Sequence, residues 1–430
     1  MPDHDFEVVV IGGGAAGIAA TRRLCDASVR CVLVEARPRL GGRAWTVMGA
    51  GFPLDLGCGW LHSGDRNPWT TIAEQEGFTI DKTPPPWMRP PLESSFPRQE
   101  HSNYREALNE YYARLREAAR RDGADAPAST LIDPNNRWAG LISAISTFVS
   151  GAELECVSMK DLERYADTGV NWRVVEGLGT TIARHGADLP VMLDCPVQRV
   201  DHGGKRVRVE TSKGVVEADQ VIIAVPASLI AAERVLFAPG LPAKVEAASK
   251  LPLGVNNKLF MLLDNAEEFD PGTRLFGHTD RVATAGYHVR PFGRPLIEAY
   301  FGGRNAAELE AKGDGAFFDF AASELTGLLG NDFRKRIKPI GVHRWGQDPF
   351  SLGAYSYAVP GFADRRQTLA APVDDRLFFA GEATSRDDFS TAHGGFRTGA
   401  AAAEQILALR GKTQVTRNTA RSSADKLPSA

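Results

Sequence analysis

A glycine-rich turn near the N-terminus constrains the fold of this chain more than any other feature. It reads G-G-G-A-A-G at residues 12–17 and follows an apolar, β-branched run at residues 6–11, which is typical of a strand buried on both faces. Residues 15–25 then have the composition of a helix, and residues 29–35 that of a second strand. This order predicts a βαβ unit of the dinucleotide-binding kind at the start of the chain.

Each glycine of this turn is expected to have its own steric role. Gly12 permits the tight turn, Gly14 lets the backbone approach a pyrophosphate, and Gly17 lets the helix pack closely on the strand. The free N–H groups at the start of the helix favour phosphate. Glu35 ends the second strand, where a carboxylate accepts ribose hydroxyls and disfavours the 2′-phosphate of NADP. The expected nucleotide contacts of this unit are Gly12, Gly14, Ala15, Ala16, Gly17, Glu35 and Ala36.

Two further segments favour FAD over NAD as the cofactor. The sequence G-G-R at residues 41–43 places a guanidinium where it can reach phosphate or flavin past two glycines. Residues 377–384, L-F-F-A-G-E-A-T, end a strand with a glycine and an acid. Both segments resemble the large flavoprotein family that contains amine oxidases, phytoene desaturases and protoporphyrinogen oxidase. This resemblance implies FAD and cofactor contacts from Gly42, Arg43, Val197, Gly381, Glu382, Thr391 and Ala392.

Residues 344–357 narrow the resemblance to flavin amine oxidases. They read R-W-x-x-D-P-x-x-x-G-x-Y-S-Y, a segment similar to that of polyamine oxidases and lysine-specific histone demethylases. The resemblance implies that Trp345 lines the flavin and that Tyr355 forms one wall of an aromatic cage for the amine. Lys258, in an apolar strand, matches the family's lysine that holds a water against flavin N5. The resemblance covers most of residues 5–410.

A histidine and a threonine complete the expected site. Residues 56–68 look like the G-x-x-W-[IL]-H-G…N-P stretch of animal-type polyamine oxidases, which implies that His62 lies beside the substrate. Thr391 stands where monoamine oxidases have the second cage tyrosine and histone demethylases have threonine, so Phe389 is left to fill that side. Ala354 stands where monoamine oxidases carry the cysteine that links the flavin, so FAD is expected to bind noncovalently.

These residues lead us to expect an amine oxidase. It would oxidise a primary or secondary amine to an imine and aldehyde, with O2 reduced to H2O2. Polyamines, monoamines and L-amino acids remain open as substrates. A desaturase of the phytoene or protoporphyrinogen type is an alternative, since it shares both FAD segments, and a flavoprotein scaffold that keeps FAD for stability is a non-catalytic one. The expected catalytic residues are Lys258, Tyr355, Trp345, His62 and Thr391.

The order of patterns along the chain predicts an α/β protein with two discontinuous domains. A Rossmann-like FAD-binding domain is expected from residues 1–82, 188–240 and 372–411, and an α+β substrate-binding domain from residues 83–187 and 241–371. Prolines at residues 84–91 mark the point where the chain first leaves the FAD-binding domain. Four acids between residues 153 and 163 are expected on a solvated helix face, namely Glu153, Glu155, Asp161 and Glu163, and residues 412–430 as a disordered tail.

Composition limits the partners and the compartment. A formal charge of −3 offers no basic footprint for nucleic acid, and no apolar run is long enough to span a membrane. The five cysteines are scattered, which favours neither a disulfide framework nor a zinc site, so no metal is expected. We therefore expect a cytoplasmic enzyme whose partners are a small amine and O2.

Overall fold

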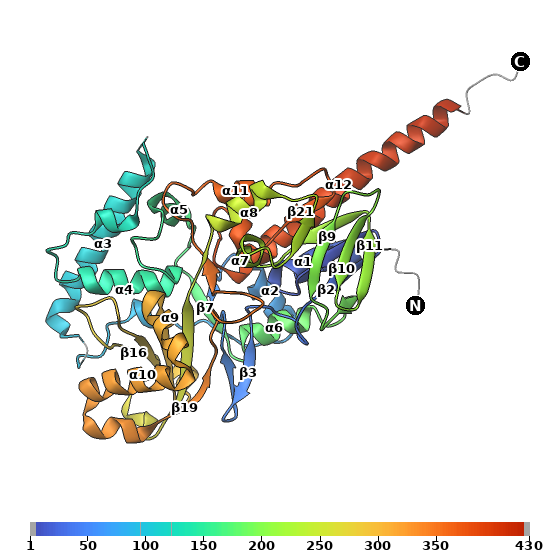
Figure 1. Ribbon diagram of the computed structural model, residues 1–430. Coiled ribbons are helices and arrows are strands. Elements are labelled where there is room, and N and C mark those ends of the chain that lie inside the picture. Colours follow the sequence, from blue (N-terminus) through green and yellow to red (C-terminus); the bar gives the residue numbers. More distant parts are fainter. Residues whose placement is uncertain (1–5, 95, 122, 425–430) are drawn as a thin grey trace, which may run out of the picture.

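The N-terminal βαβ unit forms as the sequence predicts. The computed structural model describes residues 6–94, 96–121 and 123–424 (Figure 1). Strand β1 (Val8–Ile11) leads into α1 (Ala15–Asp26) and then β2 (Cys31–Val34). A five-stranded sheet in the order β21-β12-β1-β2-β8 is built around it, and every pairing is parallel. The other strands are β8 (Val191–Met192), β12 (Gln220–Ile223) and β21 (Leu377–Phe379). Distant segments thus meet in one sheet.

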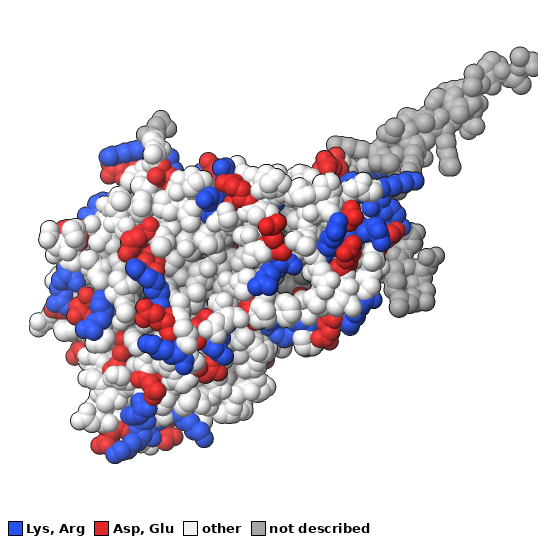
Figure 2. Space-filling view, in the orientation of Figure 1, with Lys and Arg blue, Asp and Glu red and all other residues white. Residues whose placement is uncertain are grey.

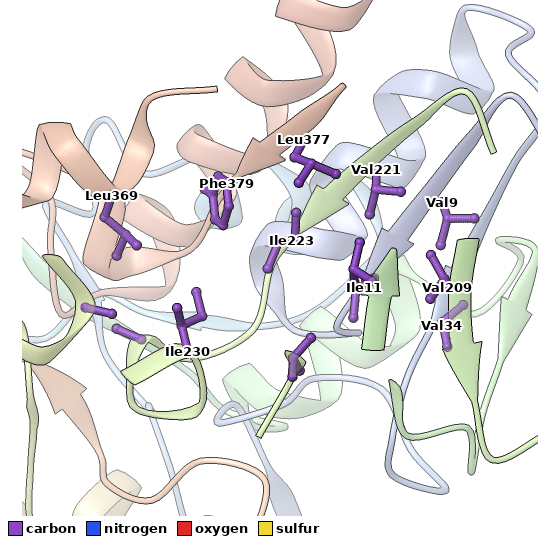
Figure 3. Close-up of a cluster of buried hydrophobic side chains, with 14 of the residues drawn as sticks. Val9, Ile11, Val34, Val209, Val221, Ile223, Ile230, Leu369, Leu377 and Phe379 are labelled. Atoms are coloured by element: carbon purple, nitrogen blue, oxygen red, sulfur yellow. The ribbon is translucent and has the colours of Figure 1, made fainter. Parts of the chain in front are cut away.

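Both faces of this sheet are buried, which explains the uninterrupted apolar runs of its strands. On one face Val9, Ile11, Val221 and Ile223 pack against a second sheet and neighbouring helices (Figure 3). That second sheet has the order β11-β10-β9-β13. Its strands are β9 (Val197–Asp201), β10 (Val207–Thr211), β11 (Gly214–Ala218) and β13 (Leu236–Ala238). The opposite face of the parallel sheet is covered by α1 and the first part of α12 (Ala392–Ala424).

The C-terminal helix is longer than the sequence predicted. A disordered tail was expected over residues 412–430, but α12 continues as far as Ala424. Residues 425–430 lie outside the described residues. Residues 410–424 contain no proline, so a helix that is already nucleated can continue through them, although Gly411 and several Thr, Ser and Asn residues have low helix propensity.

The other half of the molecule is built on an antiparallel sheet with the order β16-β17-β18-β15-β19. Helices α9 and α10 pack against this sheet, and α4 contacts its strand β18. Helices α3, α4 and α5 share a hydrophobic cluster with Phe276 of β16. The strands are β15 (Asn256–Leu263), β16 (Thr273–Phe276), β17 (Gly286–Val289), β18 (Leu296–Gly302) and β19 (Ile337–Val342). The helices are α3 (Arg98–Arg120), α4 (Ala139–Ser150), α5 (Met159–Arg164), α9 (Gly303–Lys312) and α10 (Asp314–Leu329).

Residues 171–185 pack differently from the expected division at residue 188. Strand β7 (Asn171–Val174) pairs with β5 (Leu61–His62) and β6 (Ile80–Asp81), and α6 (Leu178–His185) shares a core with β1 and α1. These elements are too short to show a clear periodicity in the sequence.

The remaining strands and α-helices of the described residues are β3 (Thr46–Gly49), β4 (Phe52–Asp55), α2 (Pro68–Gln75), α7 (Ala227–Ala231), α8 (Pro242–Ser249), β14 (Leu253–Gly254), β20 (Tyr355–Ser356) and α11 (Arg365–Ala370).

Two of the four acids expected on a solvated face are buried instead. Asp161 binds Arg366 through two hydrogen bonds of 2.7 and 2.8 Å, and both side chains are 1% exposed. Glu153 is buried and accepts a hydrogen bond from the backbone N–H of Arg304 at 2.8 Å. The prediction was wrong for these two because their partners lie about 150 and 200 residues further along the chain, beyond the reach of a local pattern.

Surface charges of both signs are interspersed on the face that Figure 2 shows. No helix in the described ranges combines the length and the apolar character that crossing a bilayer requires. The five cysteines have no disulfide bonds, although Sγ of Cys25 and Sγ of Cys31 lie 3.6 Å apart.

Candidate active site

One large cavity, with a volume of about 1350 Å³, joins the nucleotide end of the molecule to its α3 end. All but one of the residues expected to contact the cofactor or the substrate line it. The exception is Gly17, which was also expected among the nucleotide contacts and instead packs beneath the turn against Gly12. The lining residues expected to bind cofactor are Gly12, Gly14, Ala15, Ala16, Glu35, Ala36, Gly42, Arg43, Val197, Trp345, Gly381, Glu382, Thr391 and Ala392, and those expected near the substrate are His62, Lys258 and Tyr355.

The glycine turn has the geometry that a bound dinucleotide requires. Gly12 has a φ of +105°, and a Cβ there would lie 2.7 Å from the carbonyl oxygen of Ala224. A Cβ at Gly17 would lie 1.8 Å from the carbonyl oxygen of Gly12, so the helix packs directly on the turn. At Gly14 the nearest atom would be 3.9 Å away. Packing within the protein therefore does not explain why residue 14 is a glycine, whereas a phosphate that approaches the backbone from the cavity does.

Glu35 supports the turn from the second strand. Its carboxylate is buried and accepts hydrogen bonds from the backbone N–H groups of Gly13 and Arg37. Burial raises the pKa of Glu35, while these two hydrogen bonds oppose that rise. The carboxylate thus fixes the shape of the loop, and the residue also lines the cavity, where the sequence predicted a ribose contact.

The two FAD segments found separately in the sequence meet in an ion pair. Arg43 donates to Oε1 of Glu382 at 2.8 Å and to the carbonyl oxygen of Ala354 at 2.9 Å. Ser356 donates its hydroxyl to Oε2 of Glu382 at 2.6 Å, and the backbone N–H of Ser390 donates at 3.0 Å. Burial alone would raise the pKa of Glu382, but Arg43 and these hydrogen bonds lower it. The carboxylate is therefore ionised and joins three chain segments at the cavity wall.

Trp345 and Tyr355 are both held in place by hydrogen bonds to distant backbone. Nε1 of Trp345 donates to the carbonyl oxygen of Leu56 at 3.0 Å, and its backbone N–H donates to Oδ1 of Asn257 at 3.1 Å. The hydroxyl of Tyr355 donates to the carbonyl oxygen of Phe148 at 2.5 Å, and burial raises the pKa of that hydroxyl. Both aromatic side chains line the cavity with a fixed orientation.

A buried cluster of charges surrounds Lys258. Its Nζ donates to the carbonyl oxygen of Asp55 at 3.0 Å and lies 3.3 Å from Oε1 of Glu298. Arg173 donates to the same carboxylate at 2.8 Å, and Nδ1 of His288 lies 3.8 Å from it. Burial would raise the pKa of Glu298, but Arg173 and Lys258 hold it well below its usual range. Lys258 is thus part of the cavity wall, and Glu298 is its counter-ion.

Sequence reasoning missed Glu298 and Arg173, although one signal pointed to the first. Glu298 is a single acid inside the apolar strand β18, and an ionised group in such a strand needs a partner. The register pairs Phe260 with Glu298 and Lys258 with Tyr300, so lysine and glutamate lie diagonally on one sheet face. Arg173 carried no comparable signal in the sequence.

His62 and Thr391 occupy different roles. Nδ1 of His62 lies 2.6 Å from Oδ1 of Asn171 and donates to it, which leaves Nε2 as an acceptor. Burial lowers the pKa of His62, so the imidazole is neutral near pH 7. Thr391 accepts a hydrogen bond from the backbone N–H of Gly394 at 2.9 Å and so caps the start of α12. The Thr391 hydroxyl therefore has a structural hydrogen bond, and Phe389 also lines the cavity.

Known proteins resemble this chain over most of its length. The family model described as flavin containing amine oxidoreductase matches residues 15–91 and 89–407. Polyamine oxidase 3 of Oryza sativa subsp. japonica is 32% identical over 94% of this chain and 89% of its own. Polyamine oxidase 2 of Arabidopsis thaliana is 30% identical over 94% and 88%. A solved triple mutant of putrescine oxidase shares the fold with a TM-score of 0.75 at 18% identity, over 94% of this chain and 99% of that one.

The chain belongs to the flavin-containing amine oxidoreductase family. It is accordingly an oxidoreductase that uses FAD and acts on amines, with the α/β FAD-binding fold that the sequence predicted. The lysine-specific histone demethylase 1 homolog 1 of Oryza sativa subsp. japonica is also similar, at 28% identity, but this chain covers 52% of that relative.

Proposed function

We propose that this enzyme oxidises the C–N bond of a primary or secondary amine to an imine, which hydrolyses to an aldehyde, while O2 is reduced to H2O2. The observation that carries the proposal is the single cavity, because the nucleotide turn, Trp345, Lys258 and Tyr355 all line it. FAD, when bound, supplies the hydride acceptor and the route of electrons to oxygen. Ala354, in place of a cysteine, supports noncovalent binding of FAD.

The cofactor would lie along the wall that begins at the glycine turn. We assign the pyrophosphate to Gly12, Gly14 and the start of α1, because the cavity reaches the backbone there. Arg43 and Glu382 would lie beside the flavin end of the cofactor, and Val197 at its adenine end. Residues 171–187 would join the FAD-binding domain, with the other boundaries as the sequence predicted, because β7 and α6 share its core.

Four residues would then act at the amine. Tyr355 and Phe389 offer aromatic faces to the substrate. A neutral His62 can accept a hydrogen bond from the amine through Nε2, which favours the unprotonated form that can lose a hydride. Lys258, held by Asp55 and Glu298, would position a water at the reacting end of the cavity. Trp345 would line the flavin.

An anaerobic titration of the purified protein tests this function. Alkylamines, diamines, polyamines and amino acids are added separately while the flavin absorbance near 450 nm is followed. We expect bleaching by at least one amine class, H2O2 when air is readmitted, and slower reoxidation in Lys258→Met. A flavin that no amine bleaches would reject the proposal and favour a desaturase-like reaction on an apolar substrate.

A further inference from the structure

Helix α9 buries one carboxylate behind the reacting end of the cavity. Glu310 is 3% exposed, and its Oε1 accepts hydrogen bonds from Nδ2 of Asn257 at 2.8 Å and from the backbone N–H of Gly346 at 2.9 Å. Neither donor is charged, and no cation among the described residues forms an ion pair with Glu310. The buried acids Glu298 and Asp161, in contrast, each pair with an arginine. Burying a carboxylate without a cation costs free energy, so stability alone does not account for Glu310.

This carboxylate determines which way the side-chain amide of Asn257 faces. A carboxylate only accepts hydrogen bonds, so it binds the NH2 end of an amide and not the oxygen. With Nδ2 of Asn257 directed to Glu310, Oδ1 is left for Trp345 and accepts its backbone N–H at 3.1 Å. The reversed amide would place two acceptors opposite each other at Glu310 and two donors opposite each other at Trp345. Glu310 therefore selects one of the two orientations.

Glu310 and Asn257 together fix the backbone of the turn that carries Trp345. The N–H of Gly346 is bound by Glu310 directly, and the preceding N–H, of Trp345, is bound through Asn257. Nε2 of Gln347 adds a third contact, to the backbone carbonyl oxygen of Glu310 at 3.0 Å. A Cβ at Gly346 would lie 2.6 Å from Oε2 of Glu310, so any larger residue there would displace the carboxylate. Helix α9 and the turn are therefore in close contact.

The indole of Trp345 is fixed at its other end as well. Its Nε1 donates to the carbonyl oxygen of Leu56 at 3.0 Å, and a Cβ at Gly57 would lie 3.1 Å from Cζ2 of the ring. Trp345 lines the cavity, whereas Glu310 and Asn257 do not. These two polar residues can therefore affect the reaction only through the residues that they hold.

We propose that Glu310, acting through Asn257, is a positioning residue that holds Trp345 in the orientation in which it lines the flavin end of the cavity. This inference rests on the proposed oxidation of amines and on the assignment of Trp345 to the flavin. If the amide could turn, the backbone N–H of Trp345 would lose its acceptor, and the contact with Leu56 alone would hold the indole. A small displacement at the reacting end lowers kcat, while binding of the amine depends on other residues and changes little.

Removing the acceptor at nearly constant side-chain volume gives the first test. In Glu310→Met both N–H donors lose their partner, so we expect kcat to fall about tenfold with KM changed by less than about twofold. The visible circular dichroism of the bound flavin should also change, because it reports the arrangement of the groups around the ring. Glu308→Met, on the exposed side of the same helix, is the matched control and should change neither quantity.

Exchanging the acid and the amide separates the effect of orientation from a general loss of packing. Asn257→Asp alone sets two buried carboxylates against each other where the present atoms lie 2.8 Å apart, so we expect kcat to fall by about tenfold or more. Adding Glu310→Gln returns a donor to the pair, and the new carboxylate can still accept the N–H of Trp345. The kcat of this double variant should therefore recover to within about threefold of the natural value.

Activity is measured per bound FAD, so that loss of cofactor or of folded protein is not counted as an effect on the reaction. The inference is overturned if flavin-loaded Glu310→Met keeps the natural kcat and dichroism, or if the double variant is no better than Asn257→Asp alone. The comparison of these last two variants decides the matter if Glu310→Met does not fold. If no amine reduces the flavin of the natural protein, the proposed function itself fails, and the dichroism of the same variants still shows whether Glu310 positions Trp345.

Discussion

At the scale of single residues, Glu298 makes the reacting end of the cavity possible. It is fully buried and is the shared counter-ion of Arg173 and Lys258. Trp60 and Tyr300 lie over this cluster, since the guanidinium of Arg173 is 4.9 Å from the Trp60 ring and Nζ of Lys258 is 5.5 Å from the Tyr300 ring. Two cations can be buried behind an aromatic wall only because one carboxylate is buried with them.

Replacing this carboxylate should therefore destabilise the protein. In Glu298→Gln both cations keep their burial and lose their counter-ion, so we expect the free energy of unfolding to fall by about 3 kcal/mol. Urea denaturation followed by tryptophan fluorescence measures this change. Asp319→Asn breaks the exposed pair with Arg334 and is the control, with an expected loss below about 1 kcal/mol. Equal losses in the two variants would contradict this account of Glu298.

At the scale of elements, α1 and α12 hold the cofactor wall together by close backbone contact. A Cβ at Gly399 of α12 would lie 2.0 Å from the carbonyl oxygen of Ala16 in α1. Both helices begin at the cavity, where Ala15, Ala16 and Ala392 line it. The distance between the two helices therefore sets the shape of the nucleotide site.

Gly399→Ala should separate these helices. We expect a loss of about 2 kcal/mol in the free energy of unfolding, because the added methyl meets backbone rather than a flexible side chain. We also expect weaker retention of FAD, measured as the flavin-to-protein absorbance ratio after gel filtration. Gly327→Ala in α10 is the matched control, since its Cβ would meet nothing, and it should stabilise the protein by up to about 1 kcal/mol. If Gly399→Ala left the free energy of unfolding and the retention of FAD unchanged, the close backbone contact between α1 and α12 would not be required.

The sequence allowed elements to be predicted where the signal was local. The β1–α1–β2 unit follows from a glycine turn between two apolar strands, and Arg43 and Glu382 from short segments. The sequence did not show that Arg43 and Glu382 form an ion pair, because the residue pattern of one segment does not indicate which distant segment it contacts. The burial of Asp161 and the packing of residues 171–185 escaped for the same reason.

At the scale of the whole molecule, buried carboxylates tie distant segments to one another. Glu298 links β18 to β7 and β15, Glu382 links the C-terminal FAD segment to Arg43, and Asp348 binds Arg37 at 2.6 Å and His343 at 2.9 Å. Burial would raise the pKa of each of these groups, but the cations and hydrogen bonds beside it lower that pKa below its ordinary value. These links therefore depend on the ionised form.

These depressed pKa values predict how stability depends on pH. An acid whose pKa is lower in the folded state binds more protons when unfolded, so its contribution is complete above the unfolded pKa of about 4 and is lost as the pH falls below that value. The buried acids whose pKa is raised, Glu35 and Glu324, act in the opposite direction. Because Glu298, Glu382 and Asp348 each have cationic partners, we expect the first effect to dominate.

The urea midpoint should therefore fall gently between about pH 7 and pH 5, because the unfolded chain takes up protons at the histidines whose pKa burial lowers, such as His62 and His288. It should then fall steeply between about pH 4 and pH 3, where the buried carboxylates are protonated. Glu298→Gln removes one of these groups, so its midpoint should start lower and fall less steeply over the same range. A midpoint that is unchanged at about pH 3, or a variant that falls as steeply as the natural chain, would contradict the dependence on ionised carboxylates. Because Glu298 is also the counter-ion of Lys258, the same variant shows whether acid loosens the reacting end of the cavity before the molecule as a whole unfolds.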